Sequence, residues 1–236
     1  MRGAFTGWAR VKVIFLESSL ELVPGALQRH PEVLRSARRY EIPPSRMILD
    51  KSLHYKAMES LEKKWKRGRP DILHTSLLVI TDTPLFNLGL LDVYFHILDG
   101  RVFKVSSETR LPRHLERFKG VMASLLKNNQ VPPGSPKPLI YKVADSLSEL
   151  LSSEDSKLIL LWEKGEPATL SKIVNEALKI NGFIGIGAFP QGDFEEETLK
   201  IAFQKYSIIG VGQLKAWGAA ARLLCSIEEV LGPRVS

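Results

Sequence analysis

A group of arginines in the stretch Arg110–Phe118 offers the clearest chemistry in this sequence. Pro112 is typical of the first residue of a helix, because its missing N–H costs nothing there. An apolar stripe at helical spacing follows, made of Leu115, Phe118, Met122, Leu125 and Leu126. Arg113 and Arg117 project opposite this stripe, and Arg110 can reach the same side from just before the helix.

Three guanidinium groups at a helix N-terminus indicate a phosphate site. The free N–H groups of a helix start attract anions, and arginine binds phosphate oxygens in pairs. The helix dipole makes cations unfavourable there unless they have a partner. The alternative is a solvated basic face, or ion pairs with Glu108 and Glu116.

Charge is unevenly distributed along the 236 residues, whose formal net charge is +7. Residues 1–150 hold 24 Lys and Arg against 15 Asp and Glu, a charge of +9. Residues 151–236 hold 9 against 11, a charge of −2. This asymmetry indicates that the N-terminal part binds a polyanion, although a basic balance can also serve solubility alone. A composition of 44% hydrophobic and 25% charged residues is typical of a folded α/β protein.

Cysteine content and hydropathy exclude several other classes. A single cysteine, Cys225, rules out an intrachain disulfide, and no Cys/His cluster has zinc spacing. We therefore expect no metal centre and a reducing, cytoplasmic setting. No apolar run reaches the ~18–20 residues of a membrane span. Val11–Leu16 is too short for a signal peptide and is typical of a buried strand.

Two glycine-containing loops follow apolar strands in the C-terminal part. Phe183–Ile186 leads into Gly187 and Gly192, and Tyr206–Ile209 leads into Gly210 and Gly212. Neither loop is a dinucleotide fingerprint or a Walker A motif, and the acidic residues after the first would repel a pyrophosphate. Loops at adjacent strand ends form the crevice where α/β sheets bind ligands, whereas plain tight turns are the alternative.

The rest of the pattern predicts alternating strands and helices, and so a mostly parallel sheet covered by helices. We expect helices at Pro31–Tyr40, His54–Lys66, Leu147–Leu151, Leu170–Ile180 and Leu214–Leu231. Further strands are expected at Ser76–Thr81, Leu139–Val143 and Leu158–Trp162. Leu91–Leu98 and Val102–Ser106 flank Asp99-Gly100, a dipeptide that favours a hairpin turn.

Asp82 is the candidate catalytic residue. It follows the predicted strand Ser76–Thr81, so we expect it at the carboxyl end of a strand. A turn-capping aspartate is the commoner alternative. Asp71 follows Arg69-Pro70 and is placed to orient an arginine rather than to react. No Ser/His/Asp or Cys/His arrangement stands out.

Four motifs carry a resemblance to a known family. They are Leu49–Met58 (LDKSLHYKAM), Arg67–His74 (RGRPDILH), Arg110–Arg113 with Arg117-Phe118, and Ile186–Phe194 (IGAFPQGDF). Together they resemble the signatures of the Nep1/Emg1 family, which are ribosome-biogenesis pseudouridine N1-methyltransferases of the SPOUT superfamily. The resemblance extends from Leu20 to the final helix, and the compact length is similar to that of the archaeal members.

The resemblance implies one SPOUT methyltransferase domain over residues 1–236, an α/β fold with a C-terminal trefoil knot. It implies insertions at about 40–70, a globular loop, and 92–143, a β-α-β extension. It also implies a homodimer and the cofactor S-adenosylmethionine, held in the knot by backbone groups. By position, the cofactor-binding residues are Leu160, Leu161, Trp162, Gly187, Gly192, Asp193, Ile209, Gly210, Val211, Gly212, Gln213 and Leu214.

The same match implies an RNA-binding surface made of Arg69, Arg110, Arg113 and Arg117, with Asp71 orienting Arg69. The implied reaction is methyl transfer to N1 of a pseudouridine in a hairpin loop of small-subunit (16S) rRNA. Asp82 would accept the N1 proton or fix the base. Ribosomal proteins of the small subunit are further candidate partners. Two alternatives stay open: an assembly factor that mainly holds rRNA, and a small-molecule α/β enzyme with an incidental basic face.

Overall fold

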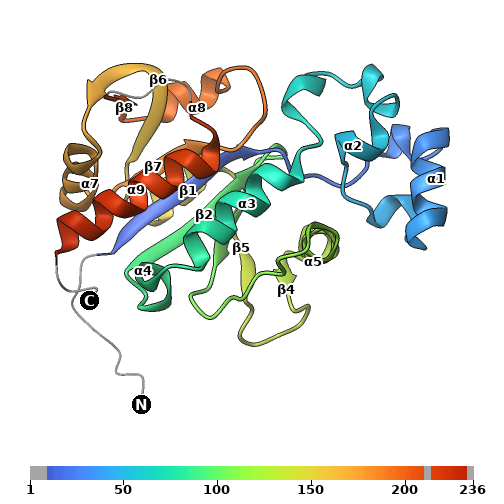
Figure 1. Ribbon diagram of the computed structural model, residues 1–236, viewed down its shortest axis with the longest axis horizontal. Coiled ribbons are helices and arrows are strands. Elements are labelled where there is room, and N and C mark those ends of the chain that lie inside the picture. The colour runs from blue at the N-terminus through green and yellow to red at the C-terminus, as the bar shows by residue number, and fades with distance from the viewer. Residues whose placement is uncertain (1–9, 210–213, 233–236) are drawn as a thin grey trace.

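The computed structural model describes residues 10–209 and 214–232, which form one β-sheet covered by helices (Figure 1). Its strands are β1 (Val11–Ser18), β2 (Leu91–Ile97), β3 (Val102–Val105), β4 (Gln130–Val131), β5 (Ile140–Ala144), β6 (Leu158–Ala168), β7 (Phe183–Gly187) and β8 (Gln204–Ile208). Its α-helices are α1 (Pro31–Tyr40), α2 (Lys51–His54), α3 (Pro70–Thr81), α4 (Pro84–Asn87), α5 (Leu115–Asn128), α6 (Leu147–Ser153), α7 (Leu170–Lys179), α8 (Glu196–Ile201) and α9 (Ala216–Leu231). Short 3-10 helices are η1 (Gly25–Leu27), η2 (Pro44–Arg46), η3 (Ala57–Ser60) and η4 (Lys64–Lys66).

The sheet is mostly parallel, as the alternating pattern predicted. Its strand order is β4-β5-β3-β2-β1-β7-β6-β8. The five neighbouring strands β2, β1, β7, β6 and β8 run parallel to one another. Strands β3, β5 and β4 extend the sheet at the β2 edge by antiparallel pairing. The β2–β3 hairpin around Asp99-Gly100 is present. The C-terminal halves of the parallel strands therefore meet at one edge of the sheet.

Strand β1 lies at the centre of the sheet, and all eight of its residues are buried. Alternate side chains of a strand point to opposite faces, so Val13 and Phe15 enter one core and Ile14 and Leu16 the other. The larger core lies under α3, α5, α7 and α9, and the smaller one under α6 and α8. Figure 1 shows α3 and α9 side by side across the sheet.

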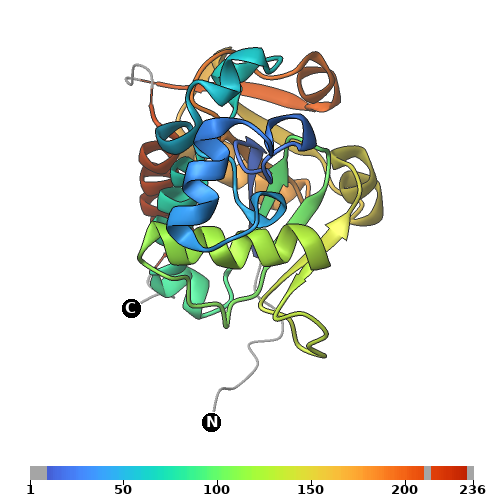
Figure 2. The ribbon, with the colours of Figure 1, turned by 90° about the vertical axis from the view of Figure 1, so that its right-hand side faces the viewer.

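A small lobe lies beyond the end of β1 and contains η1, α1, η2, α2, η3 and η4 (Figures 1 and 2). It has its own cluster of buried side chains, which includes Val23, Val33, Leu49 and Met58. The lobe leads directly into α3 through Arg69. The position of α3 on the sheet is thus coupled to the packing of this lobe.

The prediction of a strand at Ser76–Thr81 is wrong, because these residues form the second half of α3. Pro70 occupies the first turn, where its fixed φ favours a helix, and Asp71 complements the helix dipole. The apolar run reads as a strand because α3 is buried on most sides, so it lacks a polar face.

Two other predicted helices have different bounds. His54–Lys66 is not one helix but the separate short helices α2, η3 and η4, with Leu61 extended after η3 and Lys63 left-handed before η4. Helix α5 begins at Leu115 rather than at Pro112, and His114 caps it by accepting a hydrogen bond from the Glu116 N–H. Its predicted apolar stripe is confirmed, since Phe118, Met122, Leu125 and Leu126 are buried.

The remaining predicted strands and helices are confirmed, with β6 and α6 longer than expected. The trefoil knot and the insertions near 40–70 and 92–143 stay predictions. None of the described helices has both the length and the apolar character needed to cross a membrane.

Candidate functional site

The ends of β7, β6 and β8 lie next to one another at the carboxyl edge of the sheet. Leu161 of β6 pairs with Ile186 of β7 on one side and with Tyr206 of β8 on the other. The residues that follow these pairs, Trp162 and Gly187 among them, therefore converge on the same place. This geometry brings together the predicted cofactor loops as far as they are described. The predicted residues Gly210, Val211, Gly212 and Gln213 lie outside the described residues.

Trp162 and Asp193 join the first two loops. The indole Nε1–H of Trp162 donates to Asp193 Oδ1 at 2.7 Å, and the backbone N–H of Phe194 donates to the same oxygen at 2.8 Å. Lys164 Nζ lies 2.7 Å from the other oxygen, Oδ2. The Lys164 ammonium lowers the pKa of Asp193, aided by the indole and backbone N–H groups. The carboxylate is therefore charged near neutral pH and holds the loop after β7 against β6. Sequence reasoning missed Lys164.

The loop after β7 needs glycine at two predicted positions. A Cβ added to Gly187 would lie 2.9 Å from Cζ of Phe194 and 3.0 Å from Cε1 of Phe189, so these rings would have to move to admit it. Gly192 has φ +94°, a conformation that L side chains rarely adopt. The backbone can therefore approach a ligand closely here.

The other predicted cofactor residues differ in exposure. Leu160 is buried in the smaller core, so only its backbone faces the strand ends. Leu161 and Leu214 are half-buried and pack against the larger core. Ile209 leaves 53% of its surface exposed directly after β8. Its N–H donates to the carbonyl of Ala168 at 3.1 Å, so the start of the third loop is held to the end of β6.

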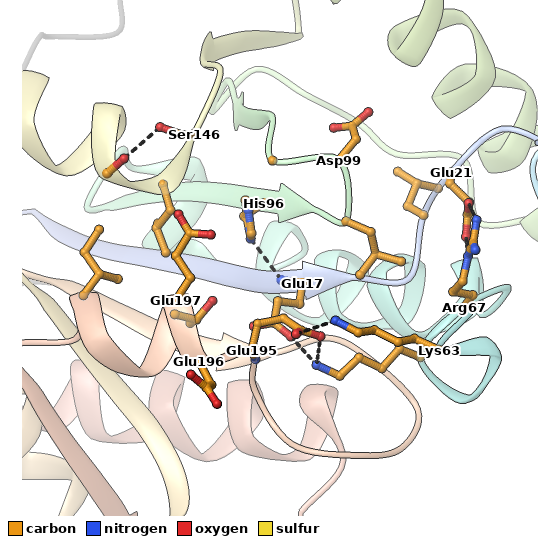
Figure 3. A pocket seen from close by; sticks show the side chains of 18 of the residues that line it. Glu17, Glu21, Lys63, Arg67, His96, Asp99, Ser146, Glu195, Glu196 and Glu197 are labelled. Atoms are coloured by element: carbon orange, nitrogen blue, oxygen red, sulfur yellow. Dashed lines mark hydrogen bonds and ion pairs between the residues drawn. The ribbon is translucent and has the colours of Figure 1, made fainter. Parts of the chain in front are cut away.

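A cleft of about 950 Å³ lies beside these loops, at the ends of β1 and β2 (Figure 3). Its charged lining is mainly acidic: Glu17, Glu21, Glu62, Asp99, Glu195, Glu196 and Glu197 against Lys63, Lys66 and Arg67. His96 also lines it and accepts a hydrogen bond from the Glu17 N–H through Nδ1. Burial lowers the pKa of His96, so the ring is neutral near pH 7. Sequence reasoning missed this cleft, because it joins strand ends to segments far along the chain.

Arg69 and Asp71 form a two-point ion pair at the start of α3. Arg69 Nε and Nη2 donate to the two carboxylate oxygens of Asp71 at 2.8 and 2.7 Å. This hydrogen-bonded pair raises the pKa of the already cationic Arg69. The backbone N–H of Arg69 also donates to Ser19 Oγ at 2.9 Å, just beyond β1. The contact expected of Asp71 is present, while RNA binding by Arg69 stays a prediction.

The arginine stretch lies alongside α3. His74 of α3 stacks on Phe118 of α5 with ring centroids 4.3 Å apart, and its Nε2–H donates to the Pro112 carbonyl at 2.7 Å. The side chains of Arg113 and Arg117 on this stretch are exposed. The stretch thus lies along α3 between Arg69 at the helix start and Asp82 at its end, and phosphate binding by its arginines stays a prediction.

Glu108 and Glu116, the possible ion-pair partners of these arginines, do not pair with them in the described structure. Glu116 pairs with Lys119 at 2.6 Å. Arg113 instead meets Asp82, with Nη2 3.3 Å from Oδ2. Arg110, also exposed, donates to the carbonyl of Thr109 at 3.0 Å. The predicted pairs with Glu108 and Glu116 are thus absent from the described part of the chain.

Asp82 does not lie at the carboxyl end of a strand. It ends α3, and its N–H donates to the Leu78 carbonyl. Helix α3 starts beside Ser19, past the end of β1, and leads through α4 to Leu90, whose carbonyl accepts from Val11 at the beginning of β1. The 12 residues of α3 span about 18 Å, so Asp82 lies towards the opposite edge of the sheet from the converging loops. The catalytic role of Asp82 stays a prediction, but its structural premise is lost.

Comparisons with known proteins agree with one another. The family model described as EMG1/NEP1 methyltransferase matches residues 13–228. The ribosomal RNA small subunit methyltransferase Nep1 of Aeropyrum pernix is 50% identical over 223 residues, 94% of this chain and 99% of that protein. The protein of the same name from Staphylothermus marinus is 42% identical over 221 residues, 93% of this chain and 96% of that protein.

One solved structure is similar over nearly its whole length. It is the crystal structure of Archaeoglobus fulgidus Nep1 bound to S-adenosylhomocysteine. Its TM-score is 0.83 at 36% sequence identity, and the likeness covers 94% of this chain and 99% of that one.

Proposed function

Because the chain belongs to the EMG1/NEP1 methyltransferase family, we propose that it methylates small-subunit ribosomal RNA with S-adenosylmethionine as the methyl donor. The finer proposal is that the acceptor is N1 of a pseudouridine in a hairpin loop. The observation that carries the proposal is the likeness to a Nep1 chain that holds S-adenosylhomocysteine. That molecule is what S-adenosylmethionine becomes once its methyl group is transferred.

The converging strand ends fit such a cofactor. They offer backbone groups of Leu160–Trp162 and Gly187–Gly192, and the exposed apolar side chain of Ile209. Among the described residues beside these loops, Lys164 is paired with Asp193 and Lys66 with Glu17 and Glu195, so neither offers the free positive charge that a phosphate would require. S-adenosylmethionine carries an adenosine and an amino acid but no phosphate. We assign its binding to these loops and to the third loop that begins at Ile209.

When bound, S-adenosylmethionine supplies an electrophilic methyl group. The reaction forms a bond between that carbon and N1, breaks the bond from carbon to sulfur, and releases the N1 proton. The chain's own residues must therefore bind the RNA loop, hold the target base outside its stack, and present N1 to the loops with little water between. Orientation of this kind can be worth about 7–11 kcal/mol of a reaction barrier at its upper end.

Arg69 and the exposed arginines of the stretch beside α3 support the RNA part of the proposal. Arg69 is held in one orientation by Asp71, and Arg110, Arg113 and Arg117 project from the neighbouring stretch. Guanidinium groups bind phosphate oxygens at two points and carry no base preference. We propose that this surface positions the RNA backbone, while the specificity for pseudouridine comes from the base pocket.

A homodimer is part of the proposal. Phe203 and Ile209 flank β8 and leave 52% and 53% of their surfaces exposed. Large apolar side chains at such exposure are candidates for burial by a second copy. Sedimentation at micromolar concentration tests this, and a monomer would contradict it. Small-subunit ribosomal proteins remain predicted partners.

The decisive experiment compares two RNA hairpins that differ at one base, pseudouridine or uridine. We expect radiolabelled methyl groups to be transferred to the pseudouridine hairpin only, because uridine has no N1–H. Mass spectrometry of the digested RNA locates the methyl group. Tight RNA binding without methyl transfer would favour the alternative, an rRNA-binding assembly factor. Transfer to both hairpins would reject the pseudouridine N1 specificity.

A further inference from the structure

Lys66 forms a buried ion pair that the methyl-transfer chemistry does not use. Its Nζ lies 2.6 Å from Oε2 of Glu17, and the two side chains are only 4% and 2% exposed. Glu17 is on β1, whereas Lys66 ends η4 in the small lobe. Two charges removed from water are retained only where their geometry is good, and an apolar pair would often stabilise the fold as well or better. The Lys66–Glu17 pair is therefore expected to have a role other than stabilising the fold.

The pair also holds the loop after β7. Oε1 of Glu17 accepts the backbone N–H of Glu195 at 2.8 Å, and Lys66 Nζ lies 3.0 Å from the Glu195 carboxylate. Figure 3 shows Glu17 and Glu195 facing each other at the end of β1. Lys66 Nζ also lies 4.5 Å from the ring centroid of Phe189, so the ammonium contacts the loop at a second place. One lysine thus touches both ends of the loop.

The neighbouring residues bring the same loop close to the small lobe. A Cβ added to Gly192 would lie 3.2 Å from the indole Nε1 of Trp65 and 3.5 Å from Cε of Lys66. The loop backbone therefore lies directly on the lobe, and glycine suits the position because of its positive φ.

The lobe is joined in turn to Arg69. Ser19 N–H donates to the carbonyl of Ala188 at 3.0 Å, and Ser19 Oγ accepts the backbone N–H of Arg69 at 2.9 Å. Arg69 is three residues after Lys66. The loop after β7 is therefore fastened to the segment that carries the first arginine of the proposed RNA surface. Displacing the loop would change its position relative to both ligands.

We propose that Lys66 is a positioning residue for the methyl donor, which acts through Glu17 and Glu195 to hold residues 188–195 in the shape that binds the cofactor. This inference rests on the proposed function, because it assigns that loop to the cofactor site. Side chains that orient a binding group from behind commonly decide whether the site is competent. A displacement of about 1 Å can cost a hundredfold in rate.

Lys63 provides a matched control. Its Nζ lies 2.7 Å from the same Glu195 carboxylate, but its side chain is 56% exposed. Exposed pairs contribute little, because water and salt already solvate both charges. Lys63→Met and Lys66→Met therefore remove the same kind of contact to one carboxylate, and only the second removes a buried contact.

The experiment measures the Kd for S-adenosylhomocysteine by calorimetry, the KM for S-adenosylmethionine and kcat at saturating cofactor. RNA Kd is measured beside them. We expect Lys66→Met to raise the cofactor Kd and KM by about tenfold or more and RNA Kd by less than about twofold. Lys63→Met should leave all four within about twofold.

A second variant separates positioning from folding, because Lys66→Met leaves Glu17 buried without a partner. Glu17→Gln combined with Lys66→Met removes both charges, so its urea midpoint should return to that of the unmodified chain. We expect its cofactor Kd to stay raised. Recovery of cofactor affinity together with the urea midpoint would overturn the inference. Absence of S-adenosylhomocysteine binding in the unmodified chain would instead reject the proposed function.

Discussion

The guanidinium of Arg113 lies 3.3 Å from the carboxylate of Asp82, a residue 31 positions earlier in the chain. The two side chains are 85% and 54% exposed, and they join the arginine stretch to the end of α3. From the sequence, Asp82 is the candidate proton acceptor. Its position beside an arginine and away from the converging strand ends favours a different role, the orientation of Arg113 for RNA.

Asp82→Asn tests that role. We expect kcat for methyl transfer to change by less than about twofold, because removing an exposed pair costs little and no reacting atom is lost. RNA affinity should fall slightly, because Arg113 loses the exposed carboxylate that orients it. Single-turnover methylation and filter binding measure the two quantities. A hundredfold fall in the single-turnover rate would restore the catalytic role of Asp82.

The paired variant Arg113→Ala with Arg117→Ala should weaken RNA binding for every sequence alike. Each phosphate contact contributes about 0.7–0.9 to the slope of log K against log salt, so the slope should fall by up to about 1.4–1.8. Arg222→Ala is the control, because Arg222 is an exposed arginine on α9, outside the arginine surface. Titrations at several salt concentrations give the slope. An unchanged slope in the paired variant would place the RNA elsewhere.

Gly187→Ala should weaken cofactor binding. The added methyl group would lie 2.9 Å from Cζ of Phe194, so the packing of Phe189 and Phe194 in the loop after β7 must change. We expect the KM for S-adenosylmethionine to rise about tenfold or more, with RNA affinity unchanged.

Gly120→Ala is the control for Gly187→Ala, because a Cβ on this exposed residue of α5 meets nothing within 4 Å. It should stabilise the fold by about 1 kcal/mol and leave the KM as it was. Steady-state kinetics measures the KM of both variants, and urea unfolding measures their stability. Equal KM values for the two variants would argue against the glycine loop as the cofactor site.

The buried pair of Asp50 and Lys119 should make stability depend on pH. Their side chains are both 8% exposed, with Lys119 Nζ 2.9 Å from the carboxylate. Burial alone would raise the pKa of Asp50, but Lys119 and the Ser52 hydroxyl and N–H outweigh it, so the pKa is lowered. The stabilisation is therefore complete above the unfolded pKa of about 3.9 and is lost as pH falls through the lower folded value.

Asp50→Asn tests this linkage. It should cost about 1–3 kcal/mol at pH 7, because Lys119 loses its buried partner but keeps the pair with the partly exposed Glu116. It should also flatten the fall in unfolding free energy below about pH 5. Asp145→Asn, on an exposed pair with Lys142, should cost less than about 1 kcal/mol. Urea unfolding from pH 7 to pH 3 measures both. A pH profile for Asp50→Asn that parallels the unmodified chain would contradict the assignment.

Local pattern was enough for much of the fold. The apolar run of β1, the hairpin at Asp99-Gly100 and the stripe of α5 were predicted because each depends on neighbouring residues alone. The strand assigned to Ser76–Thr81 was wrong, because a helix buried on most sides loses the periodicity that would reveal it. The helix predicted at 54–66 is broken by the extended backbone at Leu61 and the left-handed Lys63, which the apolar spacing does not reveal.

The sequence by itself determined which residue types are available: glycine loops after two strands, arginines around one helix start, and a basic N-terminal part. Only the tertiary structure decided which of them meet. Asp193 meets Trp162 and Lys164 because β6 and β7 are neighbours, and Lys66 meets Glu17 because the small lobe folds back on β1. Asp82 faces Arg113 rather than the strand ends because α3 runs back along the sheet. Contacts between distant segments depend on how the elements pack, and the local periodicity of the sequence carries no information about that packing.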